Sequence, residues 1–104
     1  MVDLSSTPID YVVSSNYKEF LISAGGNNSG QIYGGMSVII PAEDSGNVYF
    51  IPCYSGTTFV GIICVNYRLI PAGQPNAGSY SIRAYATQWA GSLTPAMKVY
   101  AKPQ

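Results

Sequence analysis

The hydrophobic positions of the chain are densest in residues 48–70, which contain its longest apolar run, residues 59–65 (FVGIICV). Read as a β-strand, this stretch places neighbouring side chains on opposite faces. The even face begins with the apolar Val60, Ile62 and Cys64 and turns polar at Asn66. The odd face is apolar throughout, and we expect it in the core: Phe59, Gly61, Ile63, Val65, Tyr67 and Leu69. A strand that is apolar on both faces is covered on both, so a second layer or another subunit must cover the start of the even face.

Residues 48–53 and 59–65 are predicted to form a hairpin, because residues 55–57 (SGT) between them are typical of a turn. The β-branched and aromatic side chains of both arms favour strand over helix. In this hairpin position 53 pairs near position 58, and Cys64 lies well along the other arm. The geometry then disfavours a disulfide between Cys53 and Cys64. We expect both to be small buried hydrophobic residues.

Shorter alternating segments separated by turn-forming residues fill the rest of the chain: 8–14, 17–23, 31–40, 78–87 and 94–102. The clearest alternation is in residues 78–87, and the Gly34–Gly35 pair predicts a bulge or bend. No window shows a sustained period of 3.6 residues. The pattern predicts an all-β, single-domain antiparallel β-sandwich or jelly-roll-like barrel of about seven to eight short strands over residues 1–104. We expect a polar N-terminal arm over residues 1–7 and a C-terminal tail over residues 102–104.

Charge is scarce: Asp, Glu, Lys and Arg make up 10% of the 104 residues, and five acids balance five bases. Ordinary soluble domains have about 25%. A nucleic-acid ligand is excluded, because binding it requires a concentrated positive field. A net charge near zero also weakens solubility. An uncharged, tyrosine-rich surface of this kind favours a protein whose surface is covered in an assembly.

The sequence shows neither the pattern of a signal peptide nor that of a membrane-spanning segment. Met1 is followed by neither a basic nor an apolar leader stretch. The uncharged residues 45–67 are broken by Gly, Ser, Pro and Asn, so they never reach the about 20 apolar residues of a membrane span. We expect synthesis in the host cytoplasm without a signal peptide, and no membrane partner.

The sequence carries no motif for catalysis. Histidine is absent, which removes Ser-His-Asp catalysis and most zinc sites. Asp10 and Glu19 are candidates for a glycosidase pair, but nothing near either one raises its pKa. The adjacent Glu43 and Asp44 in a turn are better explained as solvated side chains than as calcium ligands. We therefore expect no enzyme activity, cofactor or metal.

Aromatic and apolar side chains are the remaining candidates. Rigid aromatic residues with polar tips suit protein interfaces and sugar stacking. Trp89, in a glycine-containing loop, is interpreted either as a plug over one end of the fold or as a sugar platform. We expect a self-association interface among Val60, Ile62, Cys64, Tyr33, Tyr54, Tyr85 and Tyr100.

In composition and pattern the chain resembles small β-rich bacteriophage virion proteins. This resemblance implies a structural role as a head decoration (cement) protein or a fibre or knob module. Its partners would be itself, with a trimer favoured, and a major capsid or other virion protein, and its final location the virion. The alternative is a small carbohydrate-binding module with glycan contacts drawn from the loops: Trp89, Gln88, Asn27, Asn28 and Asn76.

Overall fold

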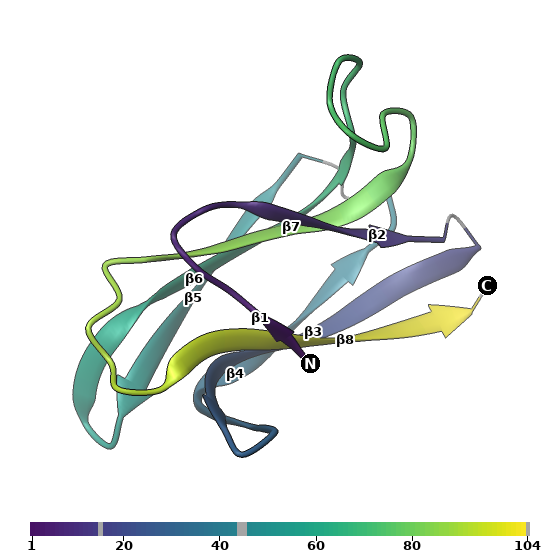
Figure 1. The fold of residues 1–104 in the computed structure, drawn as a ribbon. Helices are drawn as coiled ribbons and strands as arrows, with labels where there is room; N and C mark the ends of the chain where they lie inside the picture. Colours follow the sequence, from purple (N-terminus) through teal and green to yellow (C-terminus); the bar gives the residue numbers. More distant parts are fainter. Residues whose placement is uncertain (15, 44–45, 104) are drawn as a thin grey trace.

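The computed structural model describes residues 1–14, 16–43 and 46–103, and their regular structure is entirely β-strand. Two antiparallel four-stranded sheets face each other (Figure 1), which confirms the predicted all-β fold and matches the sandwich alternative. Their orders are β1-β8-β3-β4 and β2-β7-β6-β5. The strands are β1 (Val2–Asp3), β2 (Ile9–Val13), β3 (Tyr17–Asn28), β4 (Gln31–Pro41), β5 (Val48–Ser55), β6 (Thr58–Leu69), β7 (Tyr80–Thr87) and β8 (Thr94–Pro103). Among these described residues no helix is long and apolar enough to cross a membrane.

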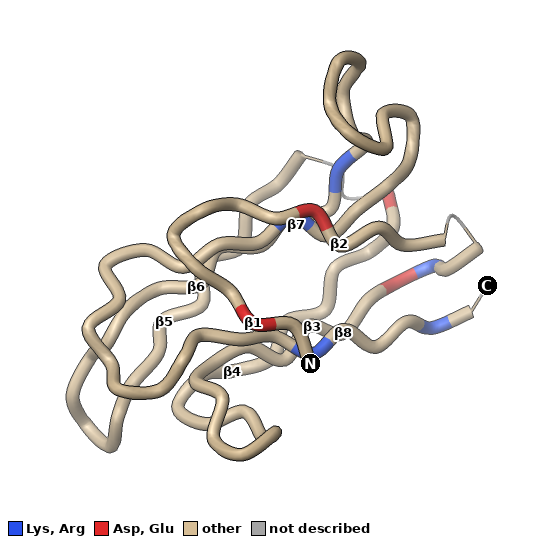
Figure 2. The backbone as a smooth tube through the Cα atoms, in the orientation of Figure 1, with Lys and Arg blue, Asp and Glu red and all other residues tan. Residues whose placement is uncertain are grey.

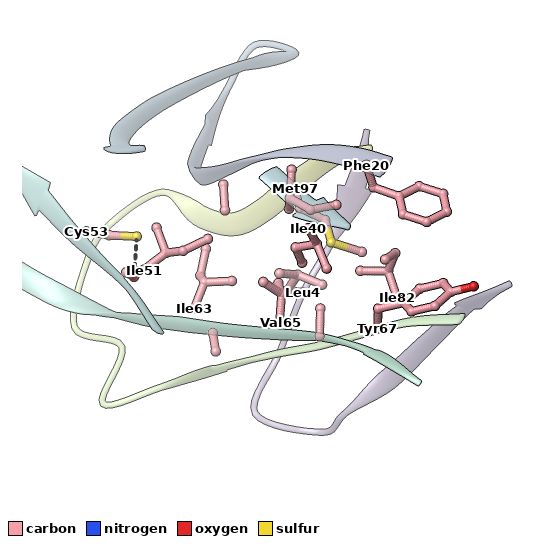
Figure 3. Close-up of a cluster of buried hydrophobic side chains, with 14 residues drawn as sticks. Leu4, Phe20, Ile40, Ile51, Cys53, Ile63, Val65, Tyr67, Ile82 and Met97 are labelled. Atoms are coloured by element: carbon pink, nitrogen blue, oxygen red, sulfur yellow. Dashed lines mark hydrogen bonds between the residues drawn. The ribbon is translucent and has the colours of Figure 1, made fainter. Parts of the chain in front are cut away.

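The core lies between the sheets and is built from the inward side of each alternating strand (Figure 3). In β7 the predicted inward residues Ile82, Ala84 and Ala86 are buried. The largest fully buried apolar side chains come from both sheets: Phe20, Ile22, Ile40, Ile51, Ile63, Val65, Ile82 and Met97. The alternation read from the sequence therefore identifies the buried face of β7 correctly.

Stacked aromatic rings fill one end of the core. Tyr67 stacks on Phe20 with ring centroids 5.3 Å apart and on Tyr80 at 5.1 Å. Tyr17 meets the edge of Phe20 at 5.9 Å. Rings at these separations interact favourably beyond the area that they bury. They tie β3 of one sheet to β6 and β7 of the other.

The β5–β6 hairpin forms as predicted, but its register differs. Cys53 pairs with Gly61 rather than with a residue near position 58, because the ladder shifts between Cys53 and Tyr54. Tyr54 pairs with Phe59, so Val60 is the extra residue of a β-bulge. The bulge reverses which β5 side chains face the core: Ile51 and Cys53 point inward, and Phe50 is exposed.

The odd face of β6 is buried only in its middle. Gly61, Ile63, Val65 and Tyr67 are buried, whereas Phe59 and Leu69, also expected in the core, are exposed. Phe59 lies beyond the bulge at the hairpin tip, and Leu69 is the last residue of the strand. At these ends the facing sheet no longer covers the strand.

The expected bulge at Gly34–Gly35 is present. Ala24 pairs with Met36 and Gly26 with Tyr33, so two β4 residues oppose Gly25 alone. A Cβ at Gly34 would lie 1.9 Å from the Tyr54 carbonyl oxygen. Only glycine permits this approach of β4 to β5.

Both cysteines are free and buried, as predicted. They lie on opposite faces of one sheet: Cys53 belongs to the core cluster, whereas Cys64 pairs with the exposed Phe50 on the outer face. The sheet itself therefore separates the two thiols.

The chain ends differ from the expected arm and tail. Val2 and Asp3 pair with β8, and Leu4 is buried and donates its backbone N–H to the Pro95 carbonyl. Because Leu4 is buried, the start of the chain is held against the sandwich, although its polar neighbours predict a free arm. At the other end Lys102 pairs with Glu19 within β8 and β3; Gln104 lies outside the described residues.

Candidate functional site

The outer face of the second sheet is divided into an apolar half and an ionic half. The strand register aligns outward side chains in rows across β5, β6 and β7. Two rows are mainly apolar: Pro52–Ile62–Thr87 and Phe50–Cys64–Tyr85. The next two contain the charges: Val48–Asn66–Arg83 and, on β6 and β7, Arg68–Ser81. This division matches the change from apolar to polar along the even face of β6.

We call the apolar half, together with the adjoining Val48, the β5–β6–β7 patch; its residues are Val48, Phe50, Pro52, Ile62, Cys64 and Tyr85. Phe50 lies on the edge strand β5, between Val48 and Pro52, and is 66% exposed. Cys64 is buried between its neighbours, and a hydrogen bond with its thiol raises the pKa of the Tyr85 hydroxyl. The patch is a preformed apolar surface on a regular sheet.

An ion cluster occupies the other half of the same face. Arg68 donates from Nε and Nη2 to the two oxygens of Asp10 at 3.0 and 2.8 Å, and Arg83 donates to Oδ2 at 3.2 Å. The Ser81 hydroxyl donates to Oδ1 at 2.8 Å. Arg68 also donates to the side-chain oxygen of Gln74 at 2.8 Å. The cluster joins three strands and the β6–β7 loop.

The same contacts set the charge state of Asp10. The hydrogen bond from Arg68 holds the pKa of Asp10 below its ordinary value, and Ser81 and Arg83 act in the same direction against partial burial. A carboxylate in this environment stays ionised and is a poor proton donor. Glu19 lies in the other sheet, 3.6 Å from Lys102. The two acids therefore do not form a hydrolytic pair.

Trp89 closes the end of the sandwich opposite the stacked tyrosines. Its ring packs against the core, and its Nε1 donates to the Leu93 carbonyl at 2.9 Å. A Cβ at Gly61 would lie 2.6 Å from Trp89 Cε3. These contacts support the interpretation of Trp89 as a plug.

A pocket with a volume of about 240 Å³ lies beside this plug. Its side chains are aromatic, aliphatic, small or polar, and none is charged. The lining includes Asn28, Tyr33, Tyr54, Ser55, Trp89 and Ser92. Figure 2 shows that the β5–β6 turn and the loop before β8 carry no Lys, Arg, Asp or Glu. The pocket therefore suits a neutral ligand that has both apolar and hydroxyl surfaces.

The expected glycan contacts are only partly brought together. Trp89 and Asn28 line the pocket, and the exposed Gln88 precedes Trp89. Asn27 is engaged elsewhere: its amide donates to Asp3, and its oxygen accepts from the Gly30 backbone. Asn76 lies in the β6–β7 loop at the other end of the molecule (Figure 1).

The expected interface residues fall into three groups. Ile62, Cys64 and Tyr85 lie together in the β5–β6–β7 patch. Val60, Tyr33 and Tyr54 instead line the pocket. Tyr100 lies on the outer face of the first sheet, in a row with Leu21 and Ile39.

Sequence reasoning missed Phe50 and Ile39, the two most exposed large hydrophobic residues described. Each stands in an apolar stretch that also supplies core residues. Only the strand register shows that they point outward. Within the described residues no group of three or more His, Cys, Asp or Glu side chains could hold a metal ion.

Comparison with protein-family models, curated proteins and solved structures finds no match to this chain.

Replacing Gly61 with alanine tests the plug. The added methyl meets the Trp89 ring at a backbone φ of 155°. We expect the free energy of unfolding to fall by about 1–3 kcal/mol, as for other overpacked sites, when measured by urea denaturation. Gly56→Ala is the control, since its methyl enters open space at φ 62°. An equal loss in both variants would contradict the packing role of Trp89.

Replacing Asp10 with asparagine tests the ion cluster. The pKa of Asp10 is lower in the folded than in the unfolded chain. The ionised carboxylate therefore stabilises the fold above about pH 4, and this contribution is lost as the pH falls through the pKa of Asp10 in the folded chain. We expect Asp10→Asn to cost about 1–2 kcal/mol at pH 7, allowing for partial exposure. It should also reduce the difference in the free energy of unfolding between pH 7 and pH 3, measured by urea denaturation.

Asp3→Asn serves as the control for this experiment. Asp3 is exposed and accepts one side-chain hydrogen bond, from Asn27. Its replacement should change stability by less than about 0.5 kcal/mol. A wild-type stability and pH profile in Asp10→Asn would show that the cluster does not stabilise the fold.

Proposed function

We propose that this protein is a non-enzymatic structural subunit of a symmetric assembly. Its most concrete form is a bacteriophage virion component, either a head decoration protein or a fibre or knob module. The observation that carries the proposal is the β5–β6–β7 patch. An antiparallel sheet that faces water normally alternates apolar inside with polar outside, and here part of the outside is apolar.

The patch has the composition of an interface core. Interface cores are depleted of charge and enriched in aromatic side chains, with a polar rim. Phe50 and Tyr85 supply the aromatic rings, and the rows with Asn66, Arg83 and Arg68 border them. Single exposed apolar residues are common on soluble proteins, whereas a contiguous group indicates a contact surface.

The assembly is a homo-oligomer in this proposal, with three copies meeting through the patch and a capsid or other virion protein as a further partner. A chain with zero formal net charge and 10% charged residues gains solubility when such a surface is covered. The compact β-domain suits a subunit that adds mass to a preformed lattice or fibre.

Replacing Phe50 with aspartate tests the patch. Phe50 is mostly exposed, so the change should spare the fold, whereas an unpaired carboxylate in a buried interface is strongly unfavourable. Light scattering behind a sizing column should give a wild-type mass of three chains of 11.1 kDa or a multiple of three. We expect the mass of Phe50→Asp to be about threefold lower.

Val12→Asp is the matched control. Val12 lies on β2 of the same sheet, opposite Ser81, and is 45% exposed, but it lies beyond the ion cluster from the patch. Its replacement should leave the mass unchanged, and circular dichroism should show that both variants are folded. A folded Phe50→Asp with the wild-type mass would contradict assembly through the patch.

A second candidate function rests on a different observation, the uncharged pocket beside Trp89. Its volume of about 240 Å³ suits a single sugar ring. Tyr33 and Tyr54 offer exposed rings for stacking, and Asn28, Ser55 and Ser92 offer hydrogen-bonding groups. In this candidate the protein is a small carbohydrate-binding module.

A glycan array tests this candidate. We expect micromolar binding of a neutral saccharide that weakens about 3- to 10-fold in Tyr33→Ala, through loss of one stacked ring. Trp89 is a poor choice for substitution because it also closes the core. Tyr100→Ala, on the outer face of the other sheet, should bind as the wild type does. An array without hits would remove the candidate.

A further inference from the structure

The four sheet edges are protected unequally. An edge strand presents unpaired backbone groups, and natural proteins shield it with short length, charge or proline. β1 has two residues, β2 follows Pro8 and contains Asp10, and β5 has Pro52 in its middle. β4 is eleven residues long, and residues 31–40 contain neither charge nor proline. β4 is therefore the edge open to another strand.

β5 closes only the first part of this edge. The Gly34 backbone lies against the Tyr54 carbonyl, where the two sheets approach each other. Beyond it, residues 36–40 (MSVII) pair with β3 on one side and, among the described strands, with none on the other. Met36 is 54% and Ile39 58% exposed. We call residues 36–40 the open edge of β4.

We propose that the open edge of β4 pairs antiparallel with the open edge of a second copy across a two-fold axis. Each copy would then add a strand to the first sheet of the other, and the two sheets would become one continuous sheet. Backbone hydrogen bonds supply the contact, as in other cases of strand addition. This contact uses a different surface from the patch, so it does not depend on the proposed function.

The described terminal segments of the chain are not available to fill this edge. Val2 and Asp3 are paired with β8, and residues 101–103 are paired with β3. Moving either terminal segment to the open edge of another copy would break these ladders, and moving the N-terminal one would expose Leu4. A whole second copy can add its β4 without losing any of its own pairing.

The absence of charge on the open edge also favours a second copy as its partner. A two-fold axis places each strand opposite itself, so any charge at its centre meets a like charge at close range, which is destabilising. The open edge has none. With the axis near Val38, Ile39 of one copy faces Ser37 of the other. Across the axis the apolar row of Leu21, Ile39 and Tyr100 then meets the polar row of Ser37, Ser23 and Lys98 of the other copy, and the two apolar rows lie diagonally to each other.

Ile39→Lys tests the proposal, because lysine on an edge strand opposes pairing with a second chain. Ile39 is exposed, so the fold should be retained. By light scattering we expect the mass to be half that of the wild type. Hydrogen exchange should show that the amides of residues 36–40 that point away from β3 are protected in the wild type and exchange faster in Ile39→Lys.

Tyr100→Lys is the matched control. Tyr100 is 53% exposed in the same row, but it lies on β8, two strands from the edge. Its replacement should leave both mass and exchange unchanged. If Tyr100→Lys also halves the mass, the contact uses the face of the sheet and the proposed edge pairing is wrong.

The remaining outcomes separate this contact from the patch. If both contacts form, the wild type has six chains, Ile39→Lys three and Phe50→Asp two. A monomeric wild type, or Ile39→Lys with unchanged mass and exchange, would refute edge pairing whatever Phe50→Asp does. Protection of residues 36–40 only when another protein copurifies would assign the edge to that protein and likewise refute self-pairing.

Discussion

The extra residue in the β5–β6 hairpin is the constraint on which the surface of this protein depends. With Val60 as a bulge, Cys53 pairs with Gly61 and Phe50 with Cys64. A regular ladder from the same turn would shift the pairing by one residue and turn the β5 side chains over. Phe50 would then enter the core, and Ile51 would face the solvent. The β5–β6–β7 patch and the place of Gly61 under Trp89 both follow from this one residue.

The parts of the fold that could be predicted from the sequence depend on local pattern. Two-residue alternation identified the buried face of β7, the turn at residues 55–57 identified the hairpin, and Gly34–Gly35 identified a bulge. The parts that could not be predicted depend on register or on distant pairing. Phe50 is exposed because of the bulge at Val60 on the partner strand β6, and Asp10 meets Arg68, 58 residues away, because β7 joins β2 to β6.

The candidate sites also divide into features that local pattern predicts and features that depend on strand pairing. Trp89 was recognisable as a loop aromatic with two interpretations, and its packing on the core supports the plug. The tyrosines expected at one interface are distributed over the pocket, the patch and the other sheet, since residue type alone does not specify a face. Leu4 is the opposite case: a residue that the sequence analysis placed in a polar arm is buried and anchors the chain end.

The patch and the open edge of β4 differ in direction as well as in chemistry. The patch faces outward along the normal of its sheet, whereas the open edge lies in the plane of the other sheet. Pro52 strengthens this distinction, because it removes a backbone donor from the edge of β5 and so disfavours strand addition beside the patch. In the assembly that we propose, a contact through side chains and a contact through backbone hydrogen bonds would join each copy to different neighbours, as growth of a symmetric assembly requires.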